Sequence, residues 1–361
     1  MRAIAPLTPS RLSAGGAGAP FVPVLAAAPP LPPVDWSRVG RAAPGLPGTS
    51  AGPLPKADAV VLTWADAEWA AMEHVFCASA TALPYSRRTT TGWSGWQRFD
   101  RGLPSGGPAG WTCWGFYRLV DLGGRTVLLF KSNTHLDWPG AGPLAQMIAL
   151  LTREAQPKLL LSIGTAGGAQ PQDHLGTVRA VSAATRYEDG VPPGRWPVYS
   201  DGWTAPWTVA GSAGMASLLL PIPSTAGGLD DLRRQFNAHY GSDYSLAQLD
   251  PAGLDQGDPQ PRIENQTGGH ESLLTTSSFV VGTTAGDFAS YACIEMDDAV
   301  VAEAAQRAGV AFGSVRNVSD PVQNPALPTS VQGNWASAVY TAYGLYTSFN
   351  GALAAWAVLV A

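Results

Sequence analysis

The segment 291–321, YACIEMDDAVVAEAAQRAGVAFGSVRNVSDP, carries the pattern that decides the fold. Within 297–308, Val and Ala residues recur at helical spacing, and Gly309 is suited to cap the end of that helix. The apolar run 311–315 then predicts a strand. In an α/β fold, the start of a helix and the end of the next parallel strand lie at the same edge of the sheet. The segment therefore predicts one such edge, where ligands commonly bind.

Acidic residues stand at both ends of this helix–strand unit. Asp297 and Asp298 could simply complement the helix dipole, which is worth about 0.3–1 kcal/mol for each charge. Asp320, directly before a proline, is typical of a turn. Each residue taken alone favours that structural role. Together with Glu295, however, these carboxylates are expected to converge on one crevice, which predicts a binding or catalytic site.

The rest of the chain alternates apolar strands with helices. We expect strands at 59–63, 115–132 (two strands joined at Gly123-Gly124), 158–163, 177–187, 278–283 and 311–315. We expect helices at 64–76, 142–157, 229–239, 297–308 and 335–359. This alternation predicts an α/β fold around a mostly parallel or mixed sheet.

Composition divides the chain into two parts. Residues 1–57 hold 12 of the 31 prolines together with many Ala and Gly, so they predict an extended arm. Residues 58–361 predict one catalytic domain, interrupted at 188–275 by an irregular insertion rich in Gly, Pro, Asp and Trp. The arm contains G-x-S-x-G at 48–52. Pro and Gly surround it where that serine-hydrolase motif needs a strand and a helix, so we attribute the match to chance.

The charge balance and the cysteine content exclude several function classes. With 22 Lys and Arg against 27 Asp and Glu, a net charge of −5 and no basic run, we expect no nucleic-acid partner. No apolar stretch approaches the roughly 20 residues of a membrane helix, and no signal peptide is recognisable, so we expect a cytoplasmic protein. The three cysteines predict free thiols, and neither they nor the five histidines form a metal motif.

Two further features point to the same crevice. The apolar strand 158–163 runs into the loop 164–168, GTAGG, where a ligand could approach the backbone, although a tight strand–loop connection is the simpler explanation. The loop matches neither G-x-G-x-x-G nor G-x-x-x-x-G-K-[ST], so we expect no dinucleotide or nucleotide cofactor. Glu68, just after the first strand, is either a first-turn helix acid or another carboxylate of the crevice.

Three separated pieces resemble the nucleoside phosphorylase/nucleosidase superfamily, which includes methylthioadenosine/S-adenosylhomocysteine nucleosidases. The pieces are 162–168 (SIGTAGG) followed by Leu175-Gly176, 295–297 (EMD) at the start of a helix, and 316–320 (RNVSD) after the next strand. Their order and spacing agree with the family, over roughly 58–187 and 276–361. The resemblance implies a nucleoside phosphorylase-like three-layer αβα sandwich around a mixed, mostly parallel sheet.

The resemblance also implies residue roles. Asp320 would be the general acid that protonates a purine leaving group, and Glu68 would position or activate the attacking water. Asp297 would hold the ribose hydroxyls, with Met296 packed under the ribose. The remaining substrate-binding residues would be Thr165, Ala166 and Gly167 along the base and ribose, Phe288 as a base-stacking residue, and Glu295, Arg316 and Ser319.

This assignment agrees with the chemistry of N-glycosidic cleavage. Breaking the bond builds positive charge on the ribose and negative charge on the base, and carboxylates near the sugar with an acid near the base answer those charges. For Asp320 to be protonated near neutral pH, burial or neighbouring acids must raise its pKa. The other carboxylates of the crevice are expected to do so.

Hydrolysis is favoured over phosphorolysis. One large branch of the family has an Arg two residues before the loop glycine, where this chain has Ser162, and the loop after the first strand also lacks Arg. Glu68 would repel phosphate and orient water. A phosphate-dependent phosphorylase is the alternative. A nucleoside-binding or storage protein without turnover is the second.

Two departures from the family limit this assignment, and the first of them, together with the insertion and the arm, favours the second alternative. The family usually has Glu at the position of Asp297, and the loop 131–142 lacks the family's compact Gly-rich form. His135 lies in this loop, where we expect a loop hydrogen bond rather than catalysis. By analogy with the family we also expect a homo-oligomer.

Overall fold

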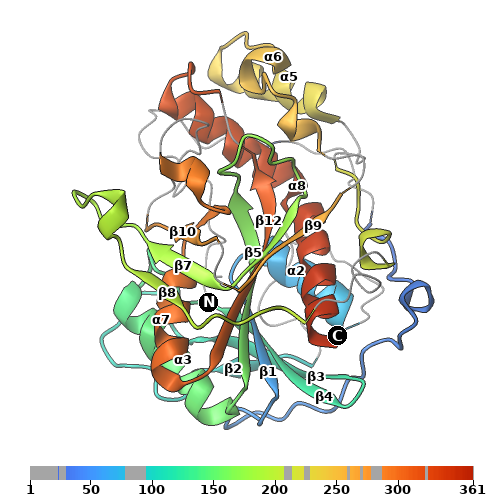
Figure 1. Ribbon diagram of the computed structural model, residues 1–361, viewed down its shortest axis with the longest axis vertical. Helices are drawn as coiled ribbons and strands as arrows, with labels where there is room; N and C mark the ends of the chain where they lie inside the picture. The colour runs from blue at the N-terminus through green and yellow to red at the C-terminus, as the bar shows by residue number, and fades with distance from the viewer. Residues whose placement is uncertain are drawn as a thin grey trace.

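The computed structural model describes residue 23 and residues 30–77, 95–206, 214–222, 228–257, 261–268, 271–277, 287–321 and 324–360. One twelve-stranded sheet organises this part of the chain. Its main strand order is β2-β3-β4-β1-β5-β11-β10-β7-β8. Outside this order, β12 pairs with both β5 and β6, and β6 also pairs with β9. Six of the eleven strand pairings are parallel, so the sheet is mixed as expected. The predicted α/β architecture is confirmed (Figure 1).

The strands are β1 (Ala59–Thr63), β2 (Gln97–Phe99), β3 (Gly115–Leu122), β4 (Arg125–Ser132), β5 (Leu159–Gly167), β6 (Val178–Val181), β7 (Ala183–Arg186), β8 (Val198–Ser200), β9 (Ile263–Gln266), β10 (Leu273–Thr275), β11 (Ile294–Glu295) and β12 (Ala311–Asp320). The α-helices are α2 (Asp66–Phe76), α3 (Ala141–Ala155), α5 (Gly228–Tyr240), α6 (Leu246–Leu249), α7 (Asp298–Ala308) and α8 (Thr329–Val360).

Helices cover both faces of the central strands. Helices α2 and α8 pack in one apolar core, and α3 and α7 pack in the other (Figure 1). Adjacent residues of β1 alternate between these cores, because Val60 faces the α3–α7 side and Val61 the α2–α8 side. Both residues are fully buried, which explains why this strand is a continuous apolar run.

Helix α3 illustrates how the sequence pattern becomes structure. Leu144, Met147, Ile148 and Leu151 form the predicted apolar stripe and are all fully buried. The helix ends at Gln156, which takes a left-handed conformation with φ of 50° directly before a proline.

Two predicted elements differ clearly from the observed ones, and a third cannot be compared. The stretch 177–187 forms two strands, because the chain changes partners at Ser182: β6 pairs with β12 and β9, and β7 pairs with β10 and β8. The final helix begins at Thr329 rather than at 335. The expected strand 278–283 lies outside the described residues.

The described part of the arm lies on the domain. Leu31 and Leu54 are buried in the two cores. The backbone oxygen of Ser50 accepts a 2.9 Å hydrogen bond from the hydroxyl of Tyr117 on β3. The segment 48–52 is therefore an extended stretch along this strand, and it lacks the strand–turn–helix setting of a nucleophilic serine.

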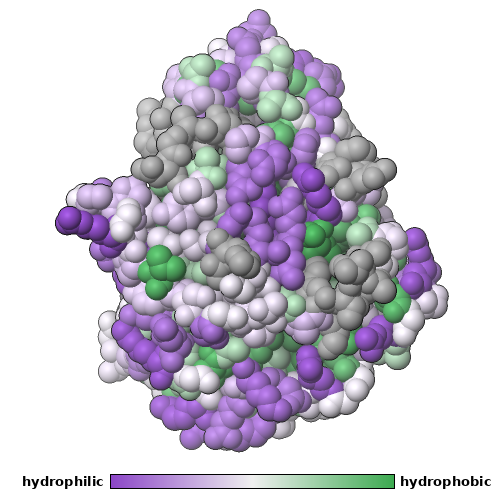
Figure 2. Space-filling model, in the orientation of Figure 1, coloured by the Kyte–Doolittle hydropathy of each residue, from purple (hydrophilic) through white to green (hydrophobic). Residues whose placement is uncertain are grey.

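The surface is predominantly hydrophilic on the face shown in Figure 2, where hydrophobic residues occupy small areas between larger hydrophilic ones. Leu46 and Val198 are the exposed large hydrophobic residues of the described chain. Among the described helices, none combines the length and the apolar character that crossing a lipid bilayer requires.

Candidate functional site

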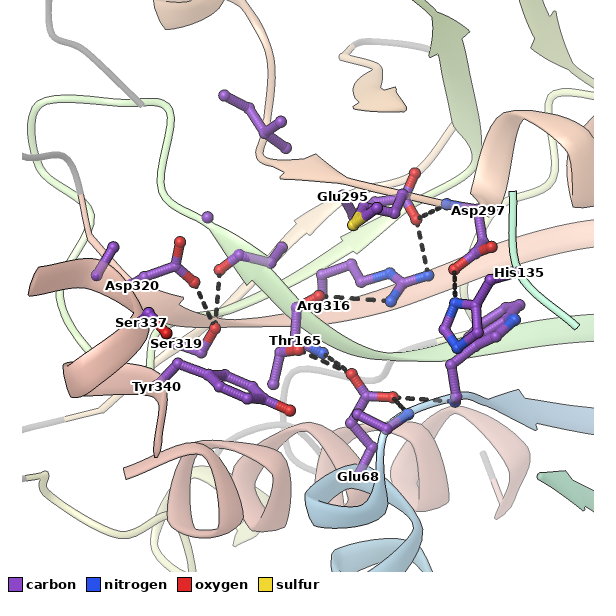
Figure 3. Close-up of a pocket in the computed structure, with 17 residues that line it drawn as sticks. Glu68, His135, Thr165, Glu295, Asp297, Arg316, Ser319, Asp320, Ser337 and Tyr340 are labelled. Atoms are coloured by element: carbon purple, nitrogen blue, oxygen red, sulfur yellow. Dashed lines mark hydrogen bonds and ion pairs between the residues drawn. The ribbon is translucent and has the colours of Figure 1, made fainter. Parts of the chain in front are cut away.

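A cavity opens where β5 and β12 end, and the start of α8 and the loop after β4 form two of its walls (Figure 3). Its enclosed volume is about 100 Å³, and it is partly open to solvent. Ten of the eleven predicted site residues line it: Glu68, Thr165, Ala166, Gly167, Glu295, Met296, Asp297, Arg316, Ser319 and Asp320. The carboxylates of 295–298 and 320 were expected to converge on one crevice: Glu295, Asp297 and Asp320 line the cavity, whereas Asp298 is fully buried and does not.

Phe288 is the predicted residue that the structure places elsewhere. It packs against a separate apolar cluster that includes Trp196, Tyr291 and Ile294, and it is not part of the cavity lining. The aromatic residue that reaches the cavity from the far side is Tyr340 of α8. Its ring lies close to Gly344, where an added Cβ would be only 3.1 Å from Cε2 of the ring.

Asp320 ends β12 at one end of the cavity. The Ser319 hydroxyl donates a 2.7 Å hydrogen bond to its Oδ1. Burial raises the pKa of Asp320 to about 7, and the Ser319 hydrogen bond opposes that rise. The carboxyl group can therefore hold a proton near neutral pH and release it during a reaction.

Glu68 in the first turn of α2 has the opposite character. Its Oε2 accepts hydrogen bonds from the Thr63 hydroxyl and from the amides of Trp64 and Ala65, at 2.8–3.0 Å. Its Oε1 accepts two more, from the amide and the hydroxyl of Thr165, both at 2.8 Å. Burial alone would raise the pKa of Glu68, but Arg316 and these donors outweigh it, so the pKa lies below its ordinary value and the group is ionised.

Gly164 lies within β5, which extends through most of the predicted loop 164–168, and close contacts explain why this position is glycine. A Cβ at this position would lie 2.5 Å from Nη1 of Arg316 and 2.7 Å from Oε1 of Glu68. Glycine at this position therefore makes room for two charged side chains of the protein itself. This is a separate reason for glycine from the close approach of a ligand to the backbone.

Arg316 on β12 is a fixed cation beneath the cavity. Its guanidinium grips Asp298 in a fork, Nε to Oδ2 at 2.9 Å and Nη2 to Oδ1 at 2.5 Å, and Nη2 also lies 3.1 Å from Glu295. Burial lowers the pKa of Arg316, but the two carboxylates more than offset this and keep it protonated. Asp298, which the sequence analysis placed among the converging carboxylates, is thus the partner that orients Arg316.

Ser162 belongs to the same cluster. Its hydroxyl donates to Asp298 and accepts a 2.8 Å hydrogen bond from Nη2 of Arg316. Part of the family has an arginine at the position of Ser162. Here a guanidinium from β12 contacts Ser162 instead, and it is already bound to carboxylates.

Glu295 and Asp297 organise the start of α7. Both oxygens of Glu295 accept hydrogen bonds from the first amides of the helix, and its pKa is raised by burial and by Asp298 while Arg316 opposes this. The Asp297 side chain points away from its own helix. Its Oδ2 lies 3.1 Å from Nδ1 of His135, and its Oδ1 accepts a 2.8 Å hydrogen bond from the amide of Leu136 (Figure 3).

The insertion supports one wall of the cavity. The Trp335 indole of α8 donates a 2.7 Å hydrogen bond to Asp255, two residues before Ser337 and five before Tyr340, which both line the cavity. Burial and the neighbouring Asp250 raise the pKa of Asp255 well above its ordinary value. No group of three or more metal-ligating side chains occurs among the described residues.

Comparison with known proteins agrees with this architecture. The family model described as the Phosphorylase superfamily matches residues 113–349. A search of curated proteins found no match.

The chain is also similar to solved structures of nucleosidases. That of the 5′-methylthioadenosine/S-adenosylhomocysteine nucleosidase of Neisseria meningitidis, with methylthio-immucillin-A, shows 11% identity and a TM-score of 0.45, covering 84% of this chain and 99% of that one. That of the Streptococcus pneumoniae MTA/SAH nucleosidase, with 8-aminoadenine, shows 12% identity and a TM-score of 0.45, covering 84% and 98%.

Proposed function

The chain belongs to the Phosphorylase superfamily, and on that premise we propose that it is a nucleosidase, an enzyme that hydrolyses the N-glycosidic bond of a purine nucleoside. The observation that carries the proposal is the contrast between the two kinds of carboxyl group in one cavity. Asp320 has a pKa of about 7 and can be protonated, whereas Glu68 is held ionised. Cleavage needs an acid at the departing base and negative charge near the sugar, and the two states correspond to these needs.

The proposed orientation places the base near Asp320 and the sugar near Asp297. Figure 3 shows Asp320 and Tyr340 at one end of the cavity, Asp297 and His135 at the other, and Glu68 with Thr165 between them. Asp320 would donate its proton to a ring nitrogen of the purine as the glycosidic bond breaks. Tyr340 would offer an aromatic surface to the base or its neighbouring substituent.

Glu68 would orient the attacking water. Protein donors already occupy both of its oxygens, so the water would take the place of the Thr165 hydroxyl on Oε1. Rotation about the C–O bond would turn only the hydrogen, so the Thr165 side chain would turn about its Cα–Cβ bond to make room, whereas the amide of Thr165 stays fixed. The water would then attack the anomeric carbon and give up a proton to Glu68, while the nearby carboxylates stabilise the positive charge that develops on the sugar.

The charges of the cavity favour water over phosphate as the nucleophile. Its described lining includes four carboxyl residues, Glu68, Glu295, Asp297 and Asp320, while Arg316 is its one arginine or lysine. Arg316 is already paired with Glu295 and Asp298. An entering phosphate or a substrate 5′-phosphate would meet net negative charge, so the proposed substrate is an uncharged purine nucleoside.

Base release, resolved by chromatography, tests the proposal. The panel contains methylthioadenosine, S-adenosylhomocysteine, adenosine, inosine, guanosine, uridine and the corresponding monophosphates, each with and without phosphate. Free base and free sugar without phosphate are expected from at least one purine nucleoside, with 5′-thio-substituted adenosines as the first candidates. The Asp320→Asn protein serves as the matched background control.

Two outcomes would contradict the proposal. Strict dependence on phosphate, with a sugar phosphate as product, would identify a phosphorylase. Nucleoside binding without any base release would identify a binding protein that keeps the fold.

A further inference from the structure

The loop between β4 and α3 holds His135 rigidly at the sugar end of the cavity. The amide of His135 donates a 2.7 Å hydrogen bond to the Trp138 oxygen, and the amide of Gly140 donates one of 3.1 Å to the His135 oxygen. The Trp64 ring lies beside the imidazole, with the ring centroids 6.2 Å apart. The His135 side chain is only 13% exposed, and it lines the cavity.

The contact with Asp297 fixes the tautomer of this imidazole. An ionised carboxylate only accepts hydrogen bonds, so the hydrogen in the 3.1 Å contact belongs to Nδ1 of His135. In the neutral ring the other nitrogen, Nε2, is then an acceptor. Among the described residues, Nε2 has no hydrogen-bond partner.

Asp297 retains acceptor capacity of its own. Each of its oxygens receives one protein hydrogen bond, from His135 at Oδ2 and from the amide of Leu136 at Oδ1. A carboxylate oxygen has two lone pairs, so each can accept one more donor. The sugar end therefore offers a carboxylate and an imidazole nitrogen side by side, both as acceptors.

We propose that His135 is a substrate-binding residue whose Nε2 accepts a hydrogen bond from one ribose hydroxyl while Asp297 accepts one from the other. The pair then selects ribonucleosides with a free 2′,3′-diol over deoxynucleosides. This inference rests on the proposed function of the cavity. It also connects two departures seen in the sequence, since the loop that carries His135 reaches the aspartate that stands where the family usually has glutamate.

Selectivity for a missing hydroxyl separates this role from a structural one. His135→Asn keeps an N–H group near the position of Nδ1, so the Asp297 contact can persist, but it removes Nε2. Adenosine, 2′-deoxyadenosine and 3′-deoxyadenosine are compared by kcat/KM for base release and by calorimetric dissociation constants. His239→Asn, at an exposed position of α5, is the matched control.

The expected result is a loss of about fivefold to tenfold for adenosine in His135→Asn, the usual contribution of one neutral hydrogen bond. For the deoxynucleoside that lacks the contacted hydroxyl, the variant and the wild type should be equal. Equal losses for all three nucleosides, or no loss for any, would overturn the inference.

Failure of the proposed function has a different signature. If the wild type binds nucleosides but releases no base, nucleosidase activity is disproved, and the dissociation constants still decide the role of His135. If the wild type binds no nucleoside, both the proposed function and the inference are overturned.

Discussion

Asp320 and Glu68 lie in the same cavity, yet their surroundings give them opposite protonation behaviour. Glu68 accepts five hydrogen bonds and has Arg316 nearby, and its pKa is lowered although the residue is only 5% exposed. Asp320 accepts one side-chain hydrogen bond among the described residues, from Ser319, and its pKa rises to about 7. Asp320 is half-buried and Glu68 is buried, so the donors and the nearby cation, rather than greater exposure, account for the lower pKa of Glu68.

This contrast predicts that the two carboxylates fail in different ways when they are changed. Asp320 should be needed for catalysis but should destabilise the folded protein, whereas Glu68 should be needed for both catalysis and stability. The predictions below test that division, beginning with the largest expected effect.

Asp320→Asn should reduce kcat by about 10²–10⁴-fold, the usual contribution of a positioned general acid. The amide has nearly the shape of the carboxyl group but cannot transfer a proton, so the dissociation constant for the nucleoside should change little. Steady-state kinetics and calorimetry measure the two quantities. A variant that retains more than a tenth of the wild-type kcat would remove Asp320 from the mechanism.

The same substitution should stabilise the protein above neutral pH. The pKa of Asp320 is 3.8 in the unfolded chain and about 7 in the folded chain. Its contribution to the stability of the folded state is therefore complete below pH 3.8, and it is lost as the pH rises to 7. By pH 8 the ionised Asp320 should cost at most about 4 kcal/mol, and asparagine removes this cost.

Urea unfolding at pH 5 and at pH 8 measures this effect. The stability advantage of Asp320→Asn over the wild type should grow between the two pH values. Asp243→Asn, at an exposed position, should show no such growth. A pH-independent difference for Asp320→Asn would mean that its pKa is not raised in the folded state.

Glu68→Gln should both destabilise the protein and slow turnover. The new amide N–H group would face donors that now converge on a carboxylate, so we expect a loss of about 2–3 kcal/mol in the free energy of unfolding at pH 7. Because the folded pKa of Glu68 is lowered, its stabilisation is present above the ordinary value of 4.5 and declines in acid, so the gap should narrow towards pH 4.

Turnover of folded Glu68→Gln should fall sharply while nucleoside binding persists, as measured on the protein below its unfolding transition. Glu303→Gln is the control, because it removes the charge of a helix i,i+4 pair with exposed Arg307, while the glutamine oxygen can keep the hydrogen bond with Tyr199. It should cost no more than about 0.5 kcal/mol. Unchanged turnover in Glu68→Gln would remove the water-orienting role.

The sequence was informative where function depends on local order along the chain. The segments that contain Thr165, Asp297 and Asp320 each carry polar residues at the end of a strand or the start of a helix. In an α/β fold such ends lie at one edge of the sheet. The long apolar segments such as β1 and α3 were likewise predictable from their periodicity.

The sequence was uninformative where function depends on distant contacts. His135 meets Asp297 across 162 positions, and no local pattern marks that pair. Tyr340 reaches the cavity because of how α8 packs, whereas Phe288, the aromatic residue predicted to stack on the base, packs elsewhere. Strands of two to four residues, such as β10 and β11, are too short to show a period.

Ser319→Ala should give the smallest of these effects, a displaced pH profile. The Ser319 hydroxyl donates to Asp320 and lowers its pKa, so its removal should raise that pKa further. Because the reaction needs protonated Asp320, wild-type kcat/KM should decline above pH about 7, and in the variant this decline should begin at a higher pH.

Ser337→Ala is the control for that profile. Ser337 lines the same cavity from α8, but its hydroxyl has no hydrogen-bond partner among the described residues, so the alkaline decline should stay in place whatever happens to the rate. A shift of the decline to lower pH in Ser319→Ala would show that the serine does not stabilise the ionised form. The contrast between Asp320 and Glu68 would then need a cause other than the number of donors.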